Sequence, residues 1–261
     1  MSEKITIERD GHVLLIGVNR PEKRNAFDLE TIAALAKAYE RLGDDPDVRV
    51  GVLFGHGDHF SAGLDLGVVG PAVAKDGPSA LAGGGKYDPF GVWAPPVPKP
   101  VVMAVSGIAF TLSIELALAS DIVIAAEDVR FRQLEIGRGI VPFGGATFRA
   151  PAQLGWGNAM RFLLTAEEFG ASEAHRIGLV QEVVPKGQHV VRARALAQLI
   201  AKQAPLGVQA TLANARVAAK EGPRAAVEHL AAQLPRIMNS EDASEGLQSF
   251  LERREASFKG R

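Results

Sequence analysis

Apolar residues along this chain follow two patterns, and the change between them predicts two regions. Up to about residue 186, short runs rich in branched residues alternate with segments in which apolar residues recur at helical spacing. This alternation is typical of an α/β fold with parallel strands. From residue 187 onward only helical patterns remain. We therefore expect an α/β core at residues 1–186 and a helical region at 187–261.

Individual elements can be predicted within the first region. Asp10 and Gly11 form a hairpin signal between two short strands, and Asp28 is expected to cap a helix that runs to about Leu42. In the span 67–98 regular periodicity disappears, so we expect a long, mobile and functional loop there. Its aromatic residues either line a pocket or anchor the loop by packing. The expected strands are 5–8, 13–18, 48–54, 101–106, 122–126 and the phrase QEVVP, and the candidate aromatic wall residues are Phe90 and Trp93.

The segment 101–145 carries the main chemical signal. Two glutamates interrupt its apolar sequence: Glu115 in a helical segment and Glu135 in the phrase LEIG. An ionised carboxylate without a partner is costly to bury, so each needs a water, a cation or a shared proton. Paired carboxylates in a dry site can act as an acid and a base. In the alternative, structural interpretation, Glu115 faces solvent or pairs with a basic residue, and Glu135 pairs with Arg132 or Arg138.

Composition narrows the functional class. Of 261 residues, 47% are hydrophobic and 23% are charged, as in ordinary soluble globular proteins. The net charge of −1 argues against nucleic acid as the main partner. The absence of cysteine excludes disulfides and thiolate sites and fits a reducing compartment. Because the N-terminus lacks a signal-peptide pattern and no apolar run is long enough to cross a membrane, we expect a cytoplasmic protein without a membrane partner.

Other motifs carry weaker signals. The small residues of FSAGLD follow a strand, and exposed N–H groups at such a junction can hold an oxyanion. His56 and His59 lack a third ligand at a convincing spacing, so we expect no metal site. The glycines at 83–85 do not stand between a strand and a helix, so we expect no dinucleotide-binding loop. The basic phrase EKRNAF is a solvated loop or a phosphate contact.

These phrases, in this order, resemble the enoyl-CoA hydratase/isomerase family, also called the crotonase family. The resemblance covers nearly the whole chain, through NRPEKRNAFD, HFSAGLDL, VSGIAFTLSIELALASDIVIA, FRQLEIGRGIVPFGG, ASEAHRIGLVQEVVP and SFKG. It implies a crotonase-like α/β fold, with a spiral of β-β-α repeats at 1–186 that holds the acyl-CoA site. It also implies that the helices of 187–261 pack homotrimers, often paired as hexamers. The expected partners are therefore an acyl-CoA thioester and further copies of the chain.

The resemblance implies roles for individual residues. Glu115 and Glu135 fall on the two acid/base glutamates of the family's hydratases. The backbone N–H groups of Leu64 and Leu112 fall on the two oxyanion donors. The positions that resemble contacts to coenzyme A are Ala62 at the adenine, Arg24 near the phosphates, and Lys259, which reaches the nucleotide from a neighbouring subunit.

Having both glutamates favours the addition of water across the 2,3 double bond of a 2-enoyl-CoA. No metal or redox cofactor is expected, because the coenzyme A arrives as part of the substrate. Where the family has a glycine-rich stretch this chain reads FTLS, which predicts a reshaped oxyanion hole or a restricted acyl group. The alternatives are a Δ3,Δ2-enoyl-CoA isomerase, another acyl-CoA-processing crotonase and a non-catalytic acyl-CoA-binding protein. The acyl group stays open, as does the choice among fatty-acid, amino-acid, sterol and aromatic degradation.

Overall fold

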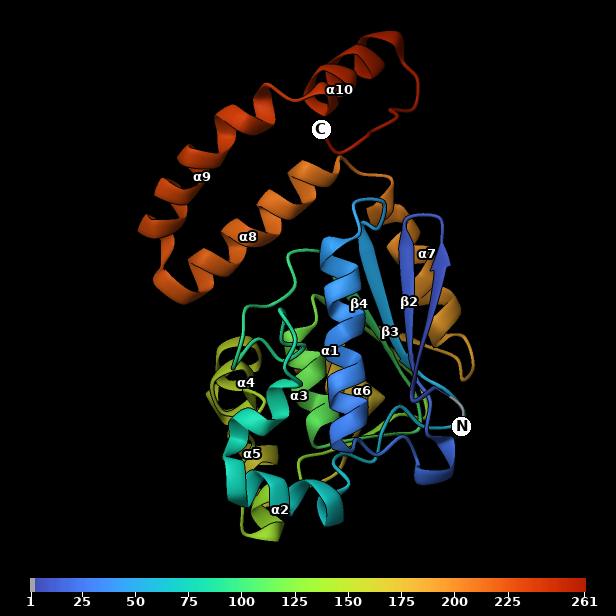
Figure 1. Ribbon diagram of the computed structural model, residues 1–261, viewed down its shortest axis with the longest axis vertical. Helices are drawn as coiled ribbons and strands as arrows, with labels where there is room; N and C mark the ends of the chain where they lie inside the picture. Colours follow the sequence, from blue (N-terminus) through green and yellow to red (C-terminus); the bar gives the residue numbers. More distant parts are fainter. Residues whose placement is uncertain (1–2) are drawn as a thin grey trace.

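The computed structural model describes residues 3–261 and contains two sheets (Figure 1). The main sheet has the strand order β1-β2-β3-β4-β6-β9, and the second has the order β5-β7-β8. In the main sheet only β1 and β2 pair antiparallel, and every other neighbouring pair is parallel. The strands are β1 (Ile5–Asp10), β2 (Val13–Val18), β3 (Val50–Gly55), β4 (Val101–Val105), β5 (Ile108–Phe110), β6 (Ile122–Ala126), β7 (Arg130–Arg132), β8 (Phe169–Gly170) and β9 (Glu182–Val184).

Helices cover the sheets and form the whole C-terminal part of the chain. Three are short 3-10 helices, η1 (Pro21–Lys23), η2 (Pro78–Ala82) and η3 (Glu135–Arg138). The α-helices are α1 (Leu29–Asp44), α2 (Leu66–Asp76), α3 (Leu112–Ala119), α4 (Ala146–Leu154), α5 (Trp156–Thr165), α6 (Ala171–Arg176), α7 (His189–Ala201), α8 (Pro205–Glu221), α9 (Pro223–Met238) and α10 (Glu241–Glu252). The predicted α/β class with a parallel sheet is thus confirmed.

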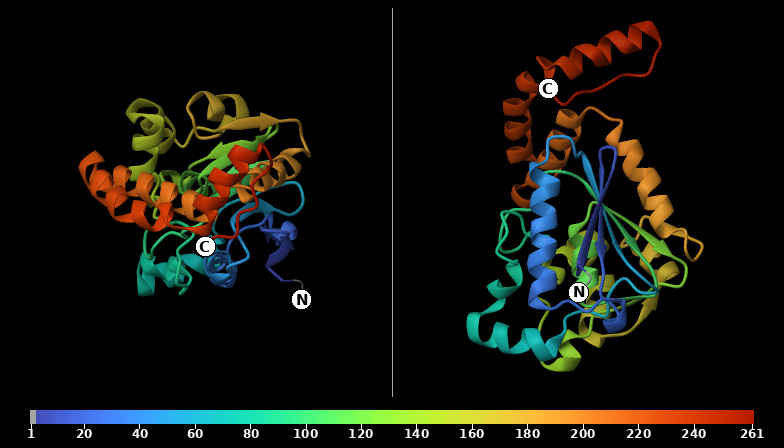
Figure 2. Two further views of the ribbon diagram at one scale, coloured as in Figure 1. Left: turned by 90° about the horizontal axis from the view of Figure 1, so that it is seen from above. Right: turned by 45° about the vertical axis from the view of Figure 1, so that its right-hand side comes forward.

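The main sheet lies between α1 on one face and α7 on the other (Figure 2). Successive side chains of a strand point to opposite faces. In β4, Val101, Met103 and Val105 therefore join the core that contains α1 and α3, whereas Val102 and Ala104 face α7. Helix α7 presents small residues, chiefly alanines, to the strands, which lets its backbone approach the sheet closely. Both faces of the sheet are buried, as the apolar composition of its parallel strands predicts.

The N-terminal hairpin and the first helix agree with their sequence signals. Strands β1 and β2 pair from Ile5 opposite Val18 to Asp10 opposite Val13, around the predicted turn. The side chain of Asp28 accepts a hydrogen bond from the Thr31 N–H at 2.8 Å, which satisfies one of the free donors at the start of α1.

The prediction of an irregular loop at 67–98 is wrong in its first half, because α2 and η2 occupy much of it. Helix α2 has no amphipathic period to reveal it. It contains Gly67, Gly70 and Pro71, and Val69 is its one buried residue. From 83 to 98 the chain has neither helix nor strand, as expected.

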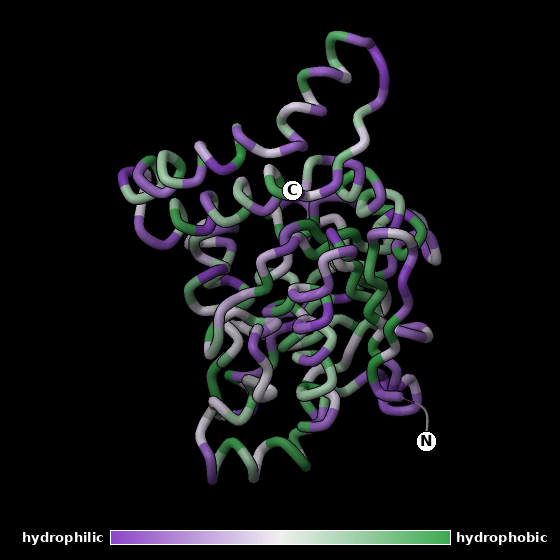
Figure 3. Tube along the Cα trace, turned by 45° about the horizontal axis from the view of Figure 1, so that its top comes forward, coloured by the Kyte–Doolittle hydropathy of each residue, from purple (hydrophilic) through white to green (hydrophobic). Residues whose placement is uncertain are grey.

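Helices α8, α9 and α10 extend away from the sheets, and the tail after α10 turns back toward α8 (Figure 1), where Arg49 donates to the Phe258 carbonyl at 2.6 Å. Hydrophobic and hydrophilic residues alternate along them (Figure 3). Within residues 3–261, none of the helices combines the length and the apolar character needed to cross a membrane.

Candidate active site

A small cavity brings together all four residues predicted to act on the substrate. Glu115 and Glu135 line it, together with Leu64 and Leu112. The space for the centre of a water molecule covers about 20 Å³, which is enough for one or two waters. The remaining wall is almost entirely apolar and includes Ile32, Leu81, Phe90, Trp93 and Phe143.

Glu115 reaches the cavity from the first turn of α3 and is 3% exposed. Its Oε1 accepts hydrogen bonds from the N–H groups of Gly144 at 2.7 Å and Ala146 at 3.1 Å. Its Oε2 has no hydrogen-bond partner among residues 3–261. Burial, together with the charge of Glu135, raises the pKa of this carboxyl to about 7 against the opposing effect of the two N–H groups. Glu115 is therefore poised to exchange a proton near neutral pH.

Glu135 begins η3 and is 7% exposed. Its Oε1 accepts a hydrogen bond from Gln133 Nε2 at 3.1 Å, and its Oε2 is buried without a partner in the described chain. Burial raises the pKa of this carboxyl to about 7 as well. The alternative of a surface ion pair is wrong, because Arg132 donates to the Ala166 carbonyl and no ion pair of the described residues includes Glu135. Each carboxyl group therefore keeps one oxygen free of protein partners.

The two predicted oxyanion donors are also free. Leu112 is the first residue of α3, so its N–H has no acceptor inside the helix. Around Leu64, the Phe27 N–H donates to the Gly63 carbonyl and the Asp65 N–H donates to the Phe27 carbonyl, both at 2.9 Å. The Leu64 N–H between these bonds has no acceptor in the part of the chain that the structure describes. The positive end of the α3 dipole adds to the attraction for a negative oxygen here.

The FTLS phrase that departs from the family pattern forms a strained turn at this point. Thr111 adopts φ 52° and ψ −112°, a conformation that costs a β-branched residue free energy. Its Oγ1 is buried without a hydrogen-bond partner in the described chain. It packs against Gly63, where any added Cβ would clash with this oxygen. The turn thus places the Leu112 N–H at the cavity without a glycine at 111.

The predicted coenzyme A contacts divide into two groups. The Ala62 N–H donates to the carbonyl of exposed Arg24 at 2.9 Å, so both residues lie beside the segment that contains Leu64. Lys259 instead lies in the C-terminal segment, where its N–H donates to Asp242 Oδ1 at 2.6 Å. Figures 1 and 2 place that segment at the opposite end of the molecule from α2. Within one chain, Lys259 does not meet the other predicted site residues.

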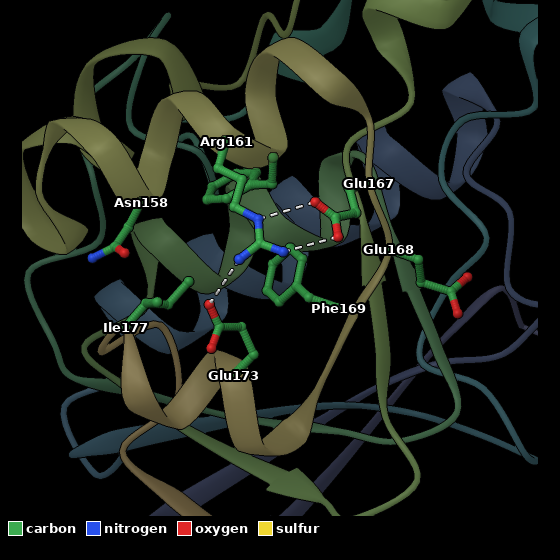
Figure 4. Close-up of a pocket in the computed structure, with 8 residues that line it drawn as sticks. Asn158, Arg161, Glu167, Glu168, Phe169, Glu173 and Ile177 are labelled. Carbon is green, nitrogen blue, oxygen red and sulfur yellow. Dashed lines mark hydrogen bonds and ion pairs between the residues drawn. The ribbon is translucent and has the colours of Figure 1, made fainter.

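A second cavity, of about 290 Å³, lies between α5 and α6 (Figure 4). Arg161 occupies its centre, with its guanidinium 2.9 Å from Glu167 and 3.9 Å from Glu173. These charges already neutralise one another at a largely exposed surface, so their pairing requires no ligand. The smaller, apolar cavity around Glu115 is the better candidate for acid/base chemistry.

The sequence as a whole agrees with this geometry. The enoyl-CoA hydratase/isomerase family model matches residues 8–261. The chain belongs to this family. It is 36% identical, over the full length of both chains, to a carnitinyl-CoA dehydratase of Salmonella heidelberg. The predicted enzyme of the lyase or isomerase type is thereby confirmed, and acyl-CoA thioesters are the substrate class that the family implies.

Solved structures support the crotonase fold. A probable enoyl-CoA hydratase/isomerase from Mycobacterium abscessus is 53% identical, with a TM-score of 0.93 and 99% of each chain covered. An enoyl-CoA hydratase from Mycobacterium tuberculosis is 32% identical, with a TM-score of 0.89 and the same coverage of both chains. The predicted crotonase-like fold is confirmed.

Proposed function

We propose that the protein adds water across the 2,3 double bond of a 2-enoyl-CoA thioester. The observation that carries this proposal is the pair of buried glutamates in one apolar cavity with two free backbone N–H groups. Raised pKa values near 7 let one carboxyl group be ionised while the other holds a proton.

The chemistry divides among these groups as follows. The ionised glutamate takes a proton from a water held between the two carboxyl groups, and the water oxygen adds to C3. The double-bond electrons move to give an enolate-like thioester, whose oxygen accepts hydrogen bonds from the N–H groups of Leu64 and Leu112. The second glutamate then gives its proton to C2. No metal or redox cofactor is required by these steps.

The coenzyme A part of the substrate is assigned to the surface beside this cavity. Arg24 is exposed and positively charged, which suits a phosphate, and the Ala62 backbone next to it can meet the adenine. Lys259 is proposed to reach the nucleotide of a neighbouring subunit in a trimer or hexamer. Self-association is supported by exposed apolar stripes at helical spacing on α9 and α10, namely Val227, Leu230, Leu234, Met238, Leu247, Phe250 and Leu251.

The relative named carnitinyl-CoA dehydratase suggests a second candidate, the dehydration of a 3-hydroxyacyl-CoA that carries a quaternary ammonium group. Phe90, Trp93 and Phe143 support this candidate, because aromatic faces attract such cations. The two glutamates would then act in the reverse direction.

The loss of ultraviolet absorbance of a conjugated enoyl thioester tests the proposal. Purified protein is added to short, long and branched 2-enoyl-CoAs, with Glu115→Gln and Glu135→Gln beside the wild type. Glu8→Gln is the control, because Glu8 is exposed on β1 and far from α3 in sequence. We expect both active-site variants to lose activity and the control to keep it.

No absorbance change with any 2-enoyl-CoA would refute hydration. Carnitinyl-CoA and 3-enoyl-CoA are assayed in parallel. Turnover of carnitinyl-CoA alone would establish the second candidate, and turnover of 3-enoyl-CoA alone would establish the isomerase.

A further inference from the structure

Asp88 is a buried charge that organises one wall of the active-site cavity. It is 1% exposed, and its carboxylate accepts hydrogen bonds from the N–H groups of Phe90 at 2.9 Å and of Val92 and Trp93, both at 2.8 Å. A buried carboxylate is costly unless such donors surround it, and charge-assisted bonds of this kind are strong. Three N–H groups of the turn 88–93 are therefore held by one side chain, and the Gly91 N–H adds a bond to the Asp88 carbonyl at 2.8 Å.

That turn delivers the two aromatic side chains of the cavity wall. Phe90 is 6% exposed, and both Phe90 and Trp93 line the cavity with Glu115. No helix or strand supports them, since residues 83–98 are irregular. Their positions thus depend on the hydrogen bonds made by Asp88.

Arg149 joins this turn to the segment that holds the Glu115 carboxyl group. From α4, its Nη2 donates to the Gly91 carbonyl at 3.2 Å and its Nη1 donates to the Gly144 carbonyl at 3.1 Å. The N–H of the same Gly144 donates to Glu115 Oε1 at 2.7 Å. One guanidinium therefore links the aromatic wall to the carboxylate through two backbone carbonyls.

The glycine at this junction shows how closely the parts are fitted. A Cβ on Gly144 would lie 2.8 Å from Phe90 Cδ1 and 2.9 Å from Glu115 Oε2, closer than real Cβ atoms come to other atoms. The wall and the carboxyl group thus meet across a single backbone segment, and movement of one displaces the other.

We propose that Asp88 and Arg149 are positioning residues that together fix the depth of the acyl pocket and the placement of Glu115. This inference rests on the proposed function. The brace, defined as Asp88, Arg149 and the carbonyls of Gly91 and Gly144, holds Phe90 and Trp93 against a cavity with room for one or two waters. An intact brace favours short acyl groups, and a released brace admits longer ones.

The test compares kcat/KM for 2-enoyl-CoAs of four and ten carbons. Asp88→Asn and Arg149→Met release the brace. Asp242→Asn and Arg49→Met are the matched controls. Asp242 is a buried carboxylate that accepts hydrogen bonds from two backbone N–H groups near the C-terminus. Arg49 donates to two backbone carbonyls, one at the end of α7 and one near the C-terminus. Both substrates share the coenzyme A part, so any change in its binding cancels in the ratio.

We expect both brace variants to shift the ratio toward the ten-carbon substrate by about tenfold or more, as pocket changes of one methylene group do. Arg149→Met should also lower kcat on the four-carbon substrate, because Gly144 loses its anchor. Arg149→Lys keeps the positive charge but lacks the forked guanidinium that bonds both carbonyls, so the kcat/KM ratio should shift by an intermediate amount. This variant replaces Arg149→Met if Arg149→Met fails to fold.

An unchanged ratio in folded brace variants, or an equal shift in the controls, would overturn the inference while leaving hydration intact. Calorimetric binding of saturated acyl-CoAs of the same lengths separates the two proposals. If no enoyl-CoA is hydrated, the proposed function fails, and the brace is judged by whether its variants tighten binding of the ten-carbon ester relative to the four-carbon ester.

Discussion

The buried carboxyl group of Glu115 makes the stability of the fold sensitive to pH. Burial raises its pKa from 4.5 to about 7. Between these values the folded chain keeps a proton that the unfolded chain releases, so the free energy of unfolding falls as pH rises through this window. At about 1.4 kcal/mol per pH unit, the difference corresponds to roughly 3 kcal/mol.

Glu115→Gln removes this ionisation and keeps an oxygen that can accept from the Gly144 and Ala146 N–H groups. The stability of the variant relative to the wild type should therefore increase by roughly 3 kcal/mol between pH 4.5 and about pH 8. Ionisable groups that do not interact with Glu115 contribute equally to both proteins and cancel in this difference, whereas the coupling of Glu115 to Glu135 is part of the shift that the difference measures.

Urea unfolding at fixed protein concentration, followed by circular dichroism across this pH range, measures the difference. Glu8→Gln, on the surface of β1, is the control and should run parallel to the wild type. Parallel curves for Glu115→Gln and the wild type would refute the reasoning, because the folded state would then not hold the extra proton.

Three further substitutions test the site and its scaffold. Thr111→Gly removes a strained φ and an unpartnered hydroxyl, each worth about 1–3 kcal/mol, against about 1 kcal/mol for the freedom of glycine in the unfolded chain. Thermal unfolding should therefore show a gain of at least about 1 kcal/mol, and a loss would contradict the strain. Gly144→Ala forces Phe90 and Glu115 apart, so kcat for hydration should fall while the variant stays folded, and an unaltered kcat would contradict the close fit. Asp28→Ala should lower stability at neutral pH by about 1 kcal/mol through loss of the α1 cap. Burial raises the pKa of Asp28, but hydrogen bonds from Lys4 and Thr31 outweigh it and lower this pKa to about 2. The loss of stability should therefore disappear as pH falls from about 4 to 2, and a loss that does not depend on pH would contradict this reasoning.

The elements of the main sheet could be predicted because their residues carry local signals. Strand β6 occupies residues 122–126, as predicted from its branched apolar run. The strands of the second sheet are only two or three residues long, too short to show a period of two. They form because Ile108–Phe110 pairs with Arg130–Arg132, a contact decided by tertiary packing.

The residues of the candidate site also differ in whether the sequence reveals them. Glu115 and Glu135 could be predicted, because a charged residue in an apolar segment is visible in the sequence itself. The contribution of Gly144 could not, since it acts through a backbone N–H that every residue except proline carries. Arg149 was missed because its bond to the Gly91 carbonyl joins positions that are 58 apart in the sequence. Asp88 was missed because it accepts from backbone N–H groups, which every residue except proline carries. The paired glycines after Pro142 were the available signal for a tight approach.

The cavity concentrates features that reduce stability, and each has a use in the proposed reaction. Excluding water raises the pKa of both glutamates into the range where they exchange protons, and the same exclusion strengthens hydrogen bonds from the Leu64 and Leu112 N–H groups to a developing negative charge. The strained turn at Thr111 leaves the Leu112 N–H without an internal partner. The packing of α7 on one face of the sheet lies outside the cavity, and α1 on the other face adds only Ile32 to the cavity wall. This packing supplies the stability that these features remove. Strain and buried charge should therefore be found at the reacting centre rather than spread through the fold.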